Sequence, residues 1–213
     1  MSVISQILLL YHSATASGPW WQAALSNTLL IPVLIVILGF GVHLITQCLL
    51  SILGFFIGSE AAYLFGNYLT YPGVVHHEMA HALFAWLLGA HIQRINLKPQ
   101  GQTLGSVNFM PRGGRIRQAL QMTLSSIAPV MLGLVSLCLI KHFCFDAETA
   151  QWVHILAVYL AVSIFFHMDL SGQDIRVALA GLPVCLLILF VVFAFWRINL
   201  IHLLRGLLLH ALA

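Results

Sequence analysis

The sequence predicts an all-α polytopic membrane protein with about five to six transmembrane helices and a small membrane-associated β-hairpin. Hydrophobic residues make up 61% of the 213 residues and charged residues only 7%, whereas about 25% charged residues is usual in globular proteins. Apolar stretches of spanning length recur along the chain, and one short stretch alternates in the manner of paired strands. Since a soluble core could not bury this much apolar surface, the chain is expected to lie in the lipid bilayer.

Five apolar stretches approach the roughly 20 residues that a spanning helix needs. These predicted spans are Leu29–Leu50, Pro72–Ala90, Ala119–Ile140, Trp152–His167 and Ala178–Trp196. Ile52–Leu69 is a further apolar stretch, interpreted as a continuation of the first helix, a re-entrant turn or a separate short span. In this stretch Asn67 is expected to cap or bridge helices. His43 and Glu60 are each expected to make one helix–helix hydrogen bond, with a water path as the alternative.

The two ends of the chain are predicted to lie in the membrane interface. Residues 1–28 form an interfacial segment anchored by Trp20 and Trp21, because tryptophan favours the headgroup region. Residues 197–213 set arginine and histidine against leucine and isoleucine, which is typical of an amphipathic helix in the interface. No internal repeat or linker divides the sequence, so residues 1–213 are expected to form one integral membrane domain.

Residues Ile92–Met110 differ from their apolar surroundings. Ile95–Lys98 and Val107–Phe109 alternate in polarity, and Pro99–Gly101 has the composition of a turn. Together these features predict a β-hairpin, with a plain amphipathic loop as the alternative. A strand edge beside an active site can pair with an extended peptide.

Basic residues gather between the second and third predicted spans. They are Arg94, Lys98, Arg112, Arg115 and Arg117. The positive-inside rule places this loop in the cytoplasm, and Arg176 then returns to the same side. Arg197 and Arg205 fit the rule less well.

Two classes of partner or site are not indicated. The sequence has no dense basic patch with interleaved aromatic residues, so a nucleic acid is not an expected partner. Its four cysteines contain no Cys-x-x-Cys pair, so neither a disulfide framework nor a cysteine zinc site is indicated.

His77-Glu78-Met79-Ala80-His81 is the most informative motif. On a helix, this spacing puts two imidazoles on one face, where both can bind one Zn²⁺, and the glutamate can act as general base on a metal-bound water. The flanks are apolar, so the site is expected at membrane depth, where such residues are costly and usually functional. The alternative is a pair of buried histidines hydrogen-bonded within the bundle. His76 points about 100° away on the helix and is expected to face a neighbouring helix or support a ligand.

The third metal ligand must come from another segment, because a catalytic zinc has three protein ligands and one open position. His167–Asp174 is the only convincing donor segment. Ser171 is expected to cap the final helix, with Asp174 held in its first turn. Asp174 is therefore the preferred third ligand and Asp169 the alternative, and either could instead be a solvated turn carboxylate.

These motifs together resemble the site-2 protease family of intramembrane zinc metalloproteases. The resemblance covers Pro72–Pro183, which would be the catalytic core, and includes Gly105-Ser106-Val107, similar to the family's strand beside the active site, and Ala128–Gly133, similar to its third core helix. It implies His77 and His81 as zinc ligands, Glu78 as general base and an aspartate as third ligand. Two features depart from the family pattern: Ala80 stands where glycine is frequent, and the usual Leu-Asp-Gly is absent.

The predicted function is that of a zinc-dependent intramembrane endopeptidase, in which Glu78 activates a zinc-bound water to cleave a transmembrane segment of a membrane protein. The chain leaves no room for a peptide-binding domain, so regulation is expected to depend on a membrane partner or on a preceding cleavage of the substrate. The expected location is a bacterial-type inner (plasma) membrane, with the active site toward the cytoplasm. A metal-ion transporter and a non-catalytic membrane scaffold are the alternatives.

Overall fold

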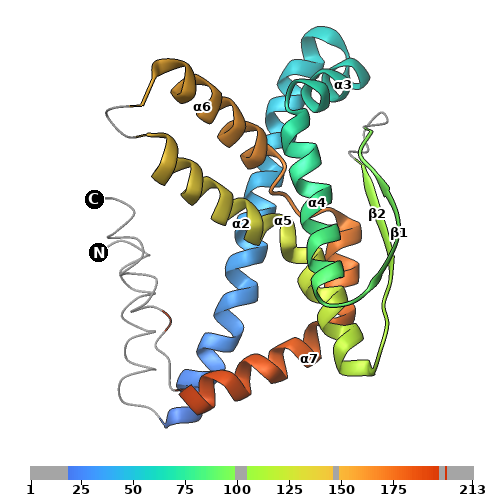
Figure 1. The fold of residues 1–213 in the computed structure, drawn as a ribbon, viewed down its shortest axis with the longest axis vertical. Helices are drawn as coiled ribbons and strands as arrows, with labels where there is room; N and C mark the ends of the chain where they lie inside the picture. The colour runs from blue at the N-terminus through green and yellow to red at the C-terminus, as the bar shows by residue number, and fades with distance from the viewer. Residues whose placement is uncertain (1–18, 99–104, 146–148, 197–199, 201–213) are drawn as a thin grey trace. The chain divides into compact units, whose positions relative to one another are not determined.

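The computed structural model describes residues 19–98, 105–145, 149–196 and 200. Their elements follow one another in the order α2 (Trp20–Ile57), α3 (Ser59–Leu69), α4 (Tyr71–Leu87), β1 (His91–Asn96), β2 (Ser106–Met110), α5 (Arg115–Cys144), α6 (Gln151–Phe166) and α7 (Gly172–Trp196) (Figure 1). The chain divides into two compact units, Met1–Leu34 with Pro183–Ala213, and Ile35–Leu182. The predicted mostly helical fold with one small sheet is confirmed.

Three of the described helices, α2, α5 and α7, are long and apolar enough to cross a membrane. Helices α4 and α6 have only 17 and 16 residues. A total of five to six spans therefore remains a prediction. Trp20 and Trp21 form the first turn of α2. Residues 22–28 of the predicted N-terminal interfacial segment also belong to α2. Residues 1–18 of that segment and almost all of the predicted amphipathic segment 197–213 lie outside the described residues.

The stretch Ile52–Leu69 is divided between two helices. Its first residues continue the first helix, α2, to Ile57, which was one of the three interpretations, and the rest forms the 11-residue helix α3. The two helices part at Gly58, whose φ of 86° is a left-handed conformation that glycine adopts without steric cost. Glycine at position 66 lets α3 approach α2 closely, since a Cβ there would lie 2.9 Å from a methyl carbon of Leu50.

Helix α4 ends earlier than the predicted span because of Gly89. This residue has a φ of 81°, its N–H donates to the Trp86 carbonyl (2.8 Å), and the N–H of Ala90 donates to the Ala85 carbonyl (2.8 Å). This pair of bonds is a Schellman motif, which ends a helix and satisfies its last carbonyls. The chain can therefore turn directly from α4 into β1.

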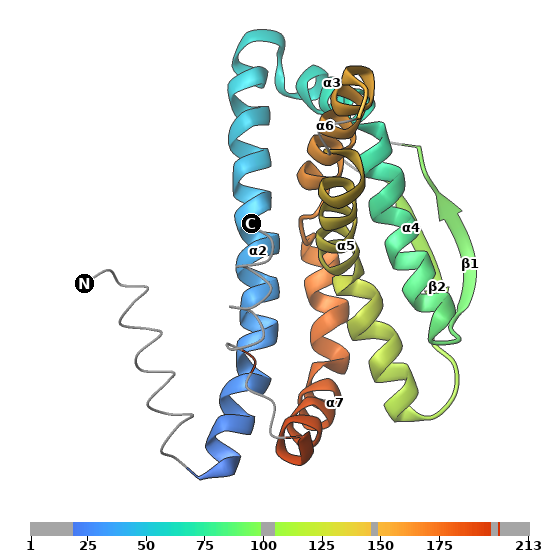
Figure 2. The same ribbon diagram turned by 60° about the vertical axis from the view of Figure 1, so that its left-hand side comes forward.

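The predicted hairpin is confirmed. Strands β1 and β2 pair antiparallel, from His91 opposite Met110 to Asn96 opposite Ser106, with a bulge between Ile92 and Arg94. The predicted turn at Pro99–Gly101 lies outside the described residues. The hairpin runs alongside α4, as Figures 1 and 2 both show.

Helix α4 is the centre of the second unit and packs against α5, α6 and the hairpin (Figure 2). Glycines allow the closest approaches between elements. A Cβ at Gly73 of α4 would overlap the Ser163 carbonyl of α6, and one at Gly133 of α5 would overlap the side chain of Met168. Small residues serve this purpose in membrane proteins, because no hydrophobic effect drives helices together in lipid.

The connection from α6 to α7, residues 167–171, is attached to three helices. Met168 joins a buried apolar cluster with Val42 of α2 and Ile164 of α6. The side chain of Leu170 packs where Gly39 of α2 has no side chain. This anchoring matters because the connection leads directly to the start of α7.

Candidate metal centre

Helix α4 carries two buried histidines on one face, His77 and His81, which are 4% and 8% exposed. Their spacing of four residues brings the rings together, with centroids 4.7 Å apart. The two Nε2 atoms are 3.0 Å apart. Each Nδ1 lies against a backbone carbonyl: that of His77 is 2.6 Å from the His167 oxygen, and that of His81 is 2.7 Å from the Ser125 oxygen.

These carbonyl contacts determine where the ring protons lie. A carbonyl oxygen can only accept, so each Nδ1 must donate and carry the hydrogen. In a neutral imidazole the other nitrogen, Nε2, then has a free lone pair. Two lone pairs therefore face each other across 3.0 Å, an arrangement that is unfavourable between the rings alone and that a shared cation would relieve.

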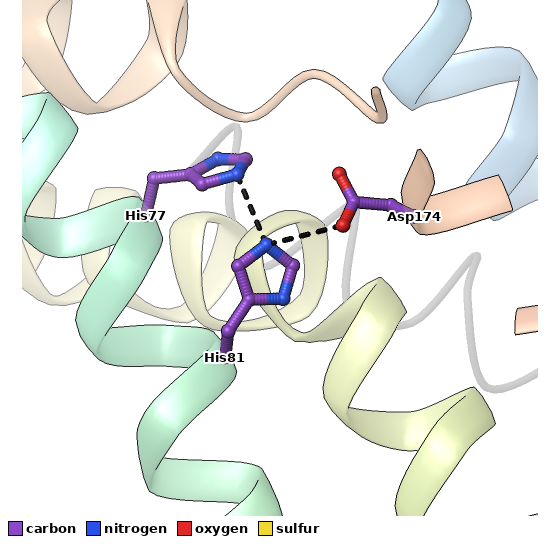
Figure 3. A group of neighbouring side chains, drawn as sticks. All are labelled: His77, His81 and Asp174. Atoms are coloured by element: carbon purple, nitrogen blue, oxygen red, sulfur yellow. Dashed lines mark hydrogen bonds and ion pairs between the residues drawn. The ribbon is translucent and has the colours of Figure 1, made fainter. Parts of the chain in front are cut away.

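The third member of the cluster is Asp174, in the first turn of α7. Its Oδ1 lies 3.4 Å from Nε2 of His81. Its Oδ2 accepts hydrogen bonds from the backbone N–H (3.0 Å) and the hydroxyl (2.6 Å) of Ser171, whose Oγ accepts from the Asp174 N–H (3.1 Å). This reciprocal capping of α7 holds one carboxylate oxygen. The other carboxylate oxygen points at the histidines, as Figure 3 shows.

His77, His81 and Asp174 form a group in which one ligand atom from each residue lies within 4.8 Å of the others. Two imidazole nitrogens and one carboxylate oxygen are a ligand set that zinc uses in catalytic sites, with a fourth position left for water. The ring nitrogens that face away from the group are already hydrogen-bonded to carbonyls, which is the usual arrangement for histidine ligands. The residues therefore fit a bound zinc ion.

Asp169, the alternative third ligand, lies in a different interaction. Its Oδ2 is 3.1 Å from Nδ1 of His43 on α2, and it is not part of the three-residue group. The hydrogen bond predicted for His43 was one between two helices, but its partner Asp169 lies in the connection between α6 and α7.

Glu78 is buried beside the histidines, with 4% of its surface exposed. The backbone of Gly105, just before β2, hydrogen-bonds to its carboxylate. The approach requires glycine: a Cβ at position 105 would lie 2.8 Å from Cγ of Glu78 and 2.5 Å from the Asn96 carbonyl oxygen. The hairpin is therefore in direct contact with the predicted general base.

A cavity of about 890 Å³ opens beside these residues. The metal-ligand candidates and Glu78 form part of its wall, and β2 contributes the run from Ser106 to Phe109. The remaining wall comes from α2, α3, β1, α5, the end of α6, the α6–α7 connection and the start of α7. The cavity is thus large enough for several residues of an extended peptide beside the histidines.

Two further polar residues were singled out from the sequence. His76 faces α5, where its Nε2 lies 2.9 Å from the Ser136 hydroxyl, as expected for a histidine turned toward a neighbouring helix. The expectation that Asn67 caps or bridges helices is wrong, because its buried amide nitrogen has no partner among the described residues. Sequence reasoning missed the contact of Gly105 with Glu78, and also the two carbonyls that hold the histidine rings. Only the tertiary packing brings these groups together.

Comparison with protein families finds a match over residues 50–212 to the family described as Peptidase M50B-like. The match covers more than half of the chain and includes α4, the hairpin and the start of α7. No curated protein and no solved structure matches the chain.

Proposed function

The chain belongs to the Peptidase M50B-like family, membrane metallopeptidases of the site-2 protease type, and from this premise we propose that it is a zinc-dependent intramembrane endopeptidase. Three long apolar helices support its place as an integral membrane protein. The observation that carries the proposal is the pair of Nε2 atoms, 3.0 Å apart, with a carboxylate oxygen 3.4 Å from one of them.

His77, His81 and Asp174 would hold the zinc ion. When bound, zinc polarises a peptide carbonyl and lowers the pKa of a water molecule toward about 7. The His167 and Ser125 carbonyls would keep both imidazoles in the tautomer that can bind a cation, and Ser171 would keep the carboxylate directed at them. These supporting contacts come from α5, from the α6–α7 connection and from the α7 cap, so the site depends on the packing of the whole second unit.

Glu78 would act as the general base. It takes a proton from the attacking water and delivers it to the amine that leaves when the peptide bond breaks. Its burial and its contact with Gly105 hold the carboxylate at the cavity wall. Removing such a group is expected to slow a reaction by about 10²–10⁴-fold.

The substrate would be a transmembrane segment of a membrane protein that unwinds locally, because an intact helix hides its carbonyls. The cavity beside β2 offers space for such an extended segment. The basic loop around the hairpin favours an active site that opens toward the cytoplasm of a bacterial-type inner membrane. Regulation would depend on a membrane partner or on a preceding cleavage of the substrate.

The test uses the purified full-length protein in liposomes. Zinc content is measured by mass spectrometry of the metal, and cleavage with a synthetic leucine-alanine transmembrane peptide that contains a central Gly-Pro pair. We expect about one zinc per chain, and cleavage that is lost in Glu78→Gln while the zinc remains. His142→Ala, an exposed histidine outside the site, is the matched control and should keep both properties.

Two outcomes would favour the alternatives. Absence of zinc from the folded wild-type protein would contradict the protease and leave a scaffold role. Zinc flux into the liposomes without peptide cleavage would indicate a metal-ion transporter.

A further inference from the structure

Asn67 of α3 is a buried polar side chain whose hydrogen-bonding capacity is not used. It is 4% exposed, and its amide nitrogen has no hydrogen-bond partner among the described residues. A buried donor without a partner costs about 1–3 kcal/mol. Such a group is therefore expected to have a function that offsets this cost.

Asn67 lines the cavity that contains the metal centre. Tyr63, one turn earlier on α3, lines the same wall. On the same wall α2 contributes His43, Thr46 and Gln47, which share one helical face because of their spacing. On other faces of the same helix Leu44, Ile45 and Leu49 are exposed, as expected for a helix in lipid. Polar residues of a membrane helix face the protein interior or a water-filled cavity, and here they face the cavity.

Most of these polar side chains already have partners. His43 pairs with Asp169, and the Thr46 hydroxyl donates to the Phe166 carbonyl (3.3 Å). The Tyr63 hydroxyl donates to the Gln47 side-chain oxygen. Among the described residues of this wall, Asn67 has a buried amide nitrogen without a partner. An incoming acceptor would give this nitrogen a hydrogen bond that it lacks.

A peptide that unwinds in this cavity has backbone groups that need hydrogen-bond partners. Each unwound residue exposes a backbone N–H and C=O that cannot stay unpaired away from water. A side-chain amide provides donors and an acceptor in one group and can therefore pair with another amide.

We propose that Asn67 forms a substrate subsite that binds one amide group of the unwound segment, next to the hydrogen-bonded pair of Gln47 and Tyr63. This inference rests on the proposed function. The amide is either a backbone peptide group or the side chain of an asparagine or glutamine. In either case Asn67 selects where the segment unwinds, and it acts at a distance from the three metal-ligand candidates, on the α2–α3 wall.

The test measures binding and cleavage of two peptide series in liposomes. Both series start from the leucine-alanine peptide with a central Gly-Pro pair. The first series carries a single asparagine at each successive position. The second replaces a single backbone amide at each position by an ester, which removes the N–H donor and weakens the carbonyl as an acceptor. Binding is measured by fluorescence in the Glu78→Gln background, and cleavage with Glu78 intact.

We expect the substitution at one position of one series to change the binding affinity by about 2–10-fold, which is the effect of one hydrogen bond. In the Asn67→Leu variant the same peptide should bind with the affinity of the starting peptide. An effect in the asparagine series identifies a side-chain amide as the ligand, and an effect in the ester series identifies the backbone. Asn67→Leu should not lower the thermal midpoint, since the amide nitrogen has no partner to lose. Asn67→Ala serves as a second variant if the leucine is not accommodated.

Ser163→Ala is the matched control. The Ser163 hydroxyl is also buried without a partner among the described residues, but it lies outside the cavity lining, so its removal should leave both series unchanged. If wild type and Asn67→Leu show the same differences in cleavage among the peptides of each series, the subsite is overturned and the protease function stands. Asn67-dependent binding without cleavage would overturn the protease and keep the subsite. Peptides that are neither bound nor cleaved would overturn both.

Discussion

Two aspartates five residues apart in the α6–α7 segment have different surroundings, and this difference assigns them different tasks. Asp174 directs Oδ1 at His81, whereas Asp169 pairs with His43 on α2. We expect Asp174→Ala to remove a zinc ligand. Asp169→Ala should act only indirectly, by loosening the connection whose His167 carbonyl holds His77.

The expected result is a zinc affinity that falls more for Asp174→Ala than the about 10–100-fold typical of outer-shell changes. Asp169→Ala should stay within that range, and His43→Ala should match it because the pair is broken in both variants. Competition with a zinc-chelating dye measures the affinities. Loss of zinc in Asp169→Ala but not in His43→Ala would identify Asp169 as a ligand after all.

The sequence predicted the two histidines well because their relation is local. Residues four apart on a helix share a face in any fold. The capping of α7 by Ser171 is also local, and it was predicted. Local sequence could not decide which of the two aspartates is the ligand. That choice depends on a tertiary contact, in which His43 of α2 binds Asp169 of the α6–α7 connection. Asn67 was misjudged for the same reason, since a cavity wall has no signature in the chain.

At the scale of elements, the hairpin is joined to the general base through Gly105. We predict that Gly105→Ala lowers peptide cleavage strongly while zinc content stays near one per chain. The added Cβ would meet Glu78 and the Asn96 carbonyl, so the hairpin must shift and the carboxylate with it. Cleavage and metal content are measured on the same preparation.

Gly41→Ala is the control for this change, because a Cβ at that position meets nothing within 4 Å. It should leave cleavage unchanged. Equal activity of Gly105→Ala and wild type would show that the hairpin does not position Glu78.

Gln121 of α5 connects three elements and is fully buried. Its side-chain oxygen accepts from the Arg112 N–H (2.8 Å), and its amide donates to the Leu88 (2.9 Å) and Arg112 (3.1 Å) carbonyls. Gln121→Leu would remove these bonds from the Arg112 N–H and carbonyl, whereas the Leu88 carbonyl keeps the bond that it accepts from Arg117 Nε (2.9 Å). We expect the free energy of unfolding to fall by about 1–3 kcal/mol, measured by denaturant titration in detergent.

Gln118→Leu, which removes a single exposed hydrogen bond to the Gly113 carbonyl, should cost less than Gln121→Leu. Equal losses in the two variants would mean that the buried groups find other partners.

The elements themselves were largely predictable, because apolar length and strand alternation are properties of short segments. The hairpin and each of the five clear apolar stretches fall on observed elements. The ends were less predictable. Gly58 and Gly89 mark the ends of two helices, where the backbone adopts a positive φ. Apolar length alone does not place these ends to the residue.

For the whole molecule, the basic loop predicts an orientation that can be tested in cells. Asn108→Cys on β2, in a variant without the four native cysteines, reports the side on which the hairpin lies. We expect an impermeant maleimide to label it only after the cells are lysed. Labelling in intact cells would reverse the predicted orientation, and a cysteine at Lys141, on the opposite side by prediction, is the matched control.

The contacts of the two histidines have a consequence for the amount of the protein in a cell. His77 is tied to the α6–α7 connection and His81 to α5, so an ion bound between them would bind the folded chain and not the unfolded one. By mass action, free metal at 100 times its dissociation constant adds about 2.7 kcal/mol to folding stability. Differences of about 1–2 kcal/mol are enough to change cellular abundance several-fold. The level of the protein would then follow the supply of zinc, even where transcription stays constant.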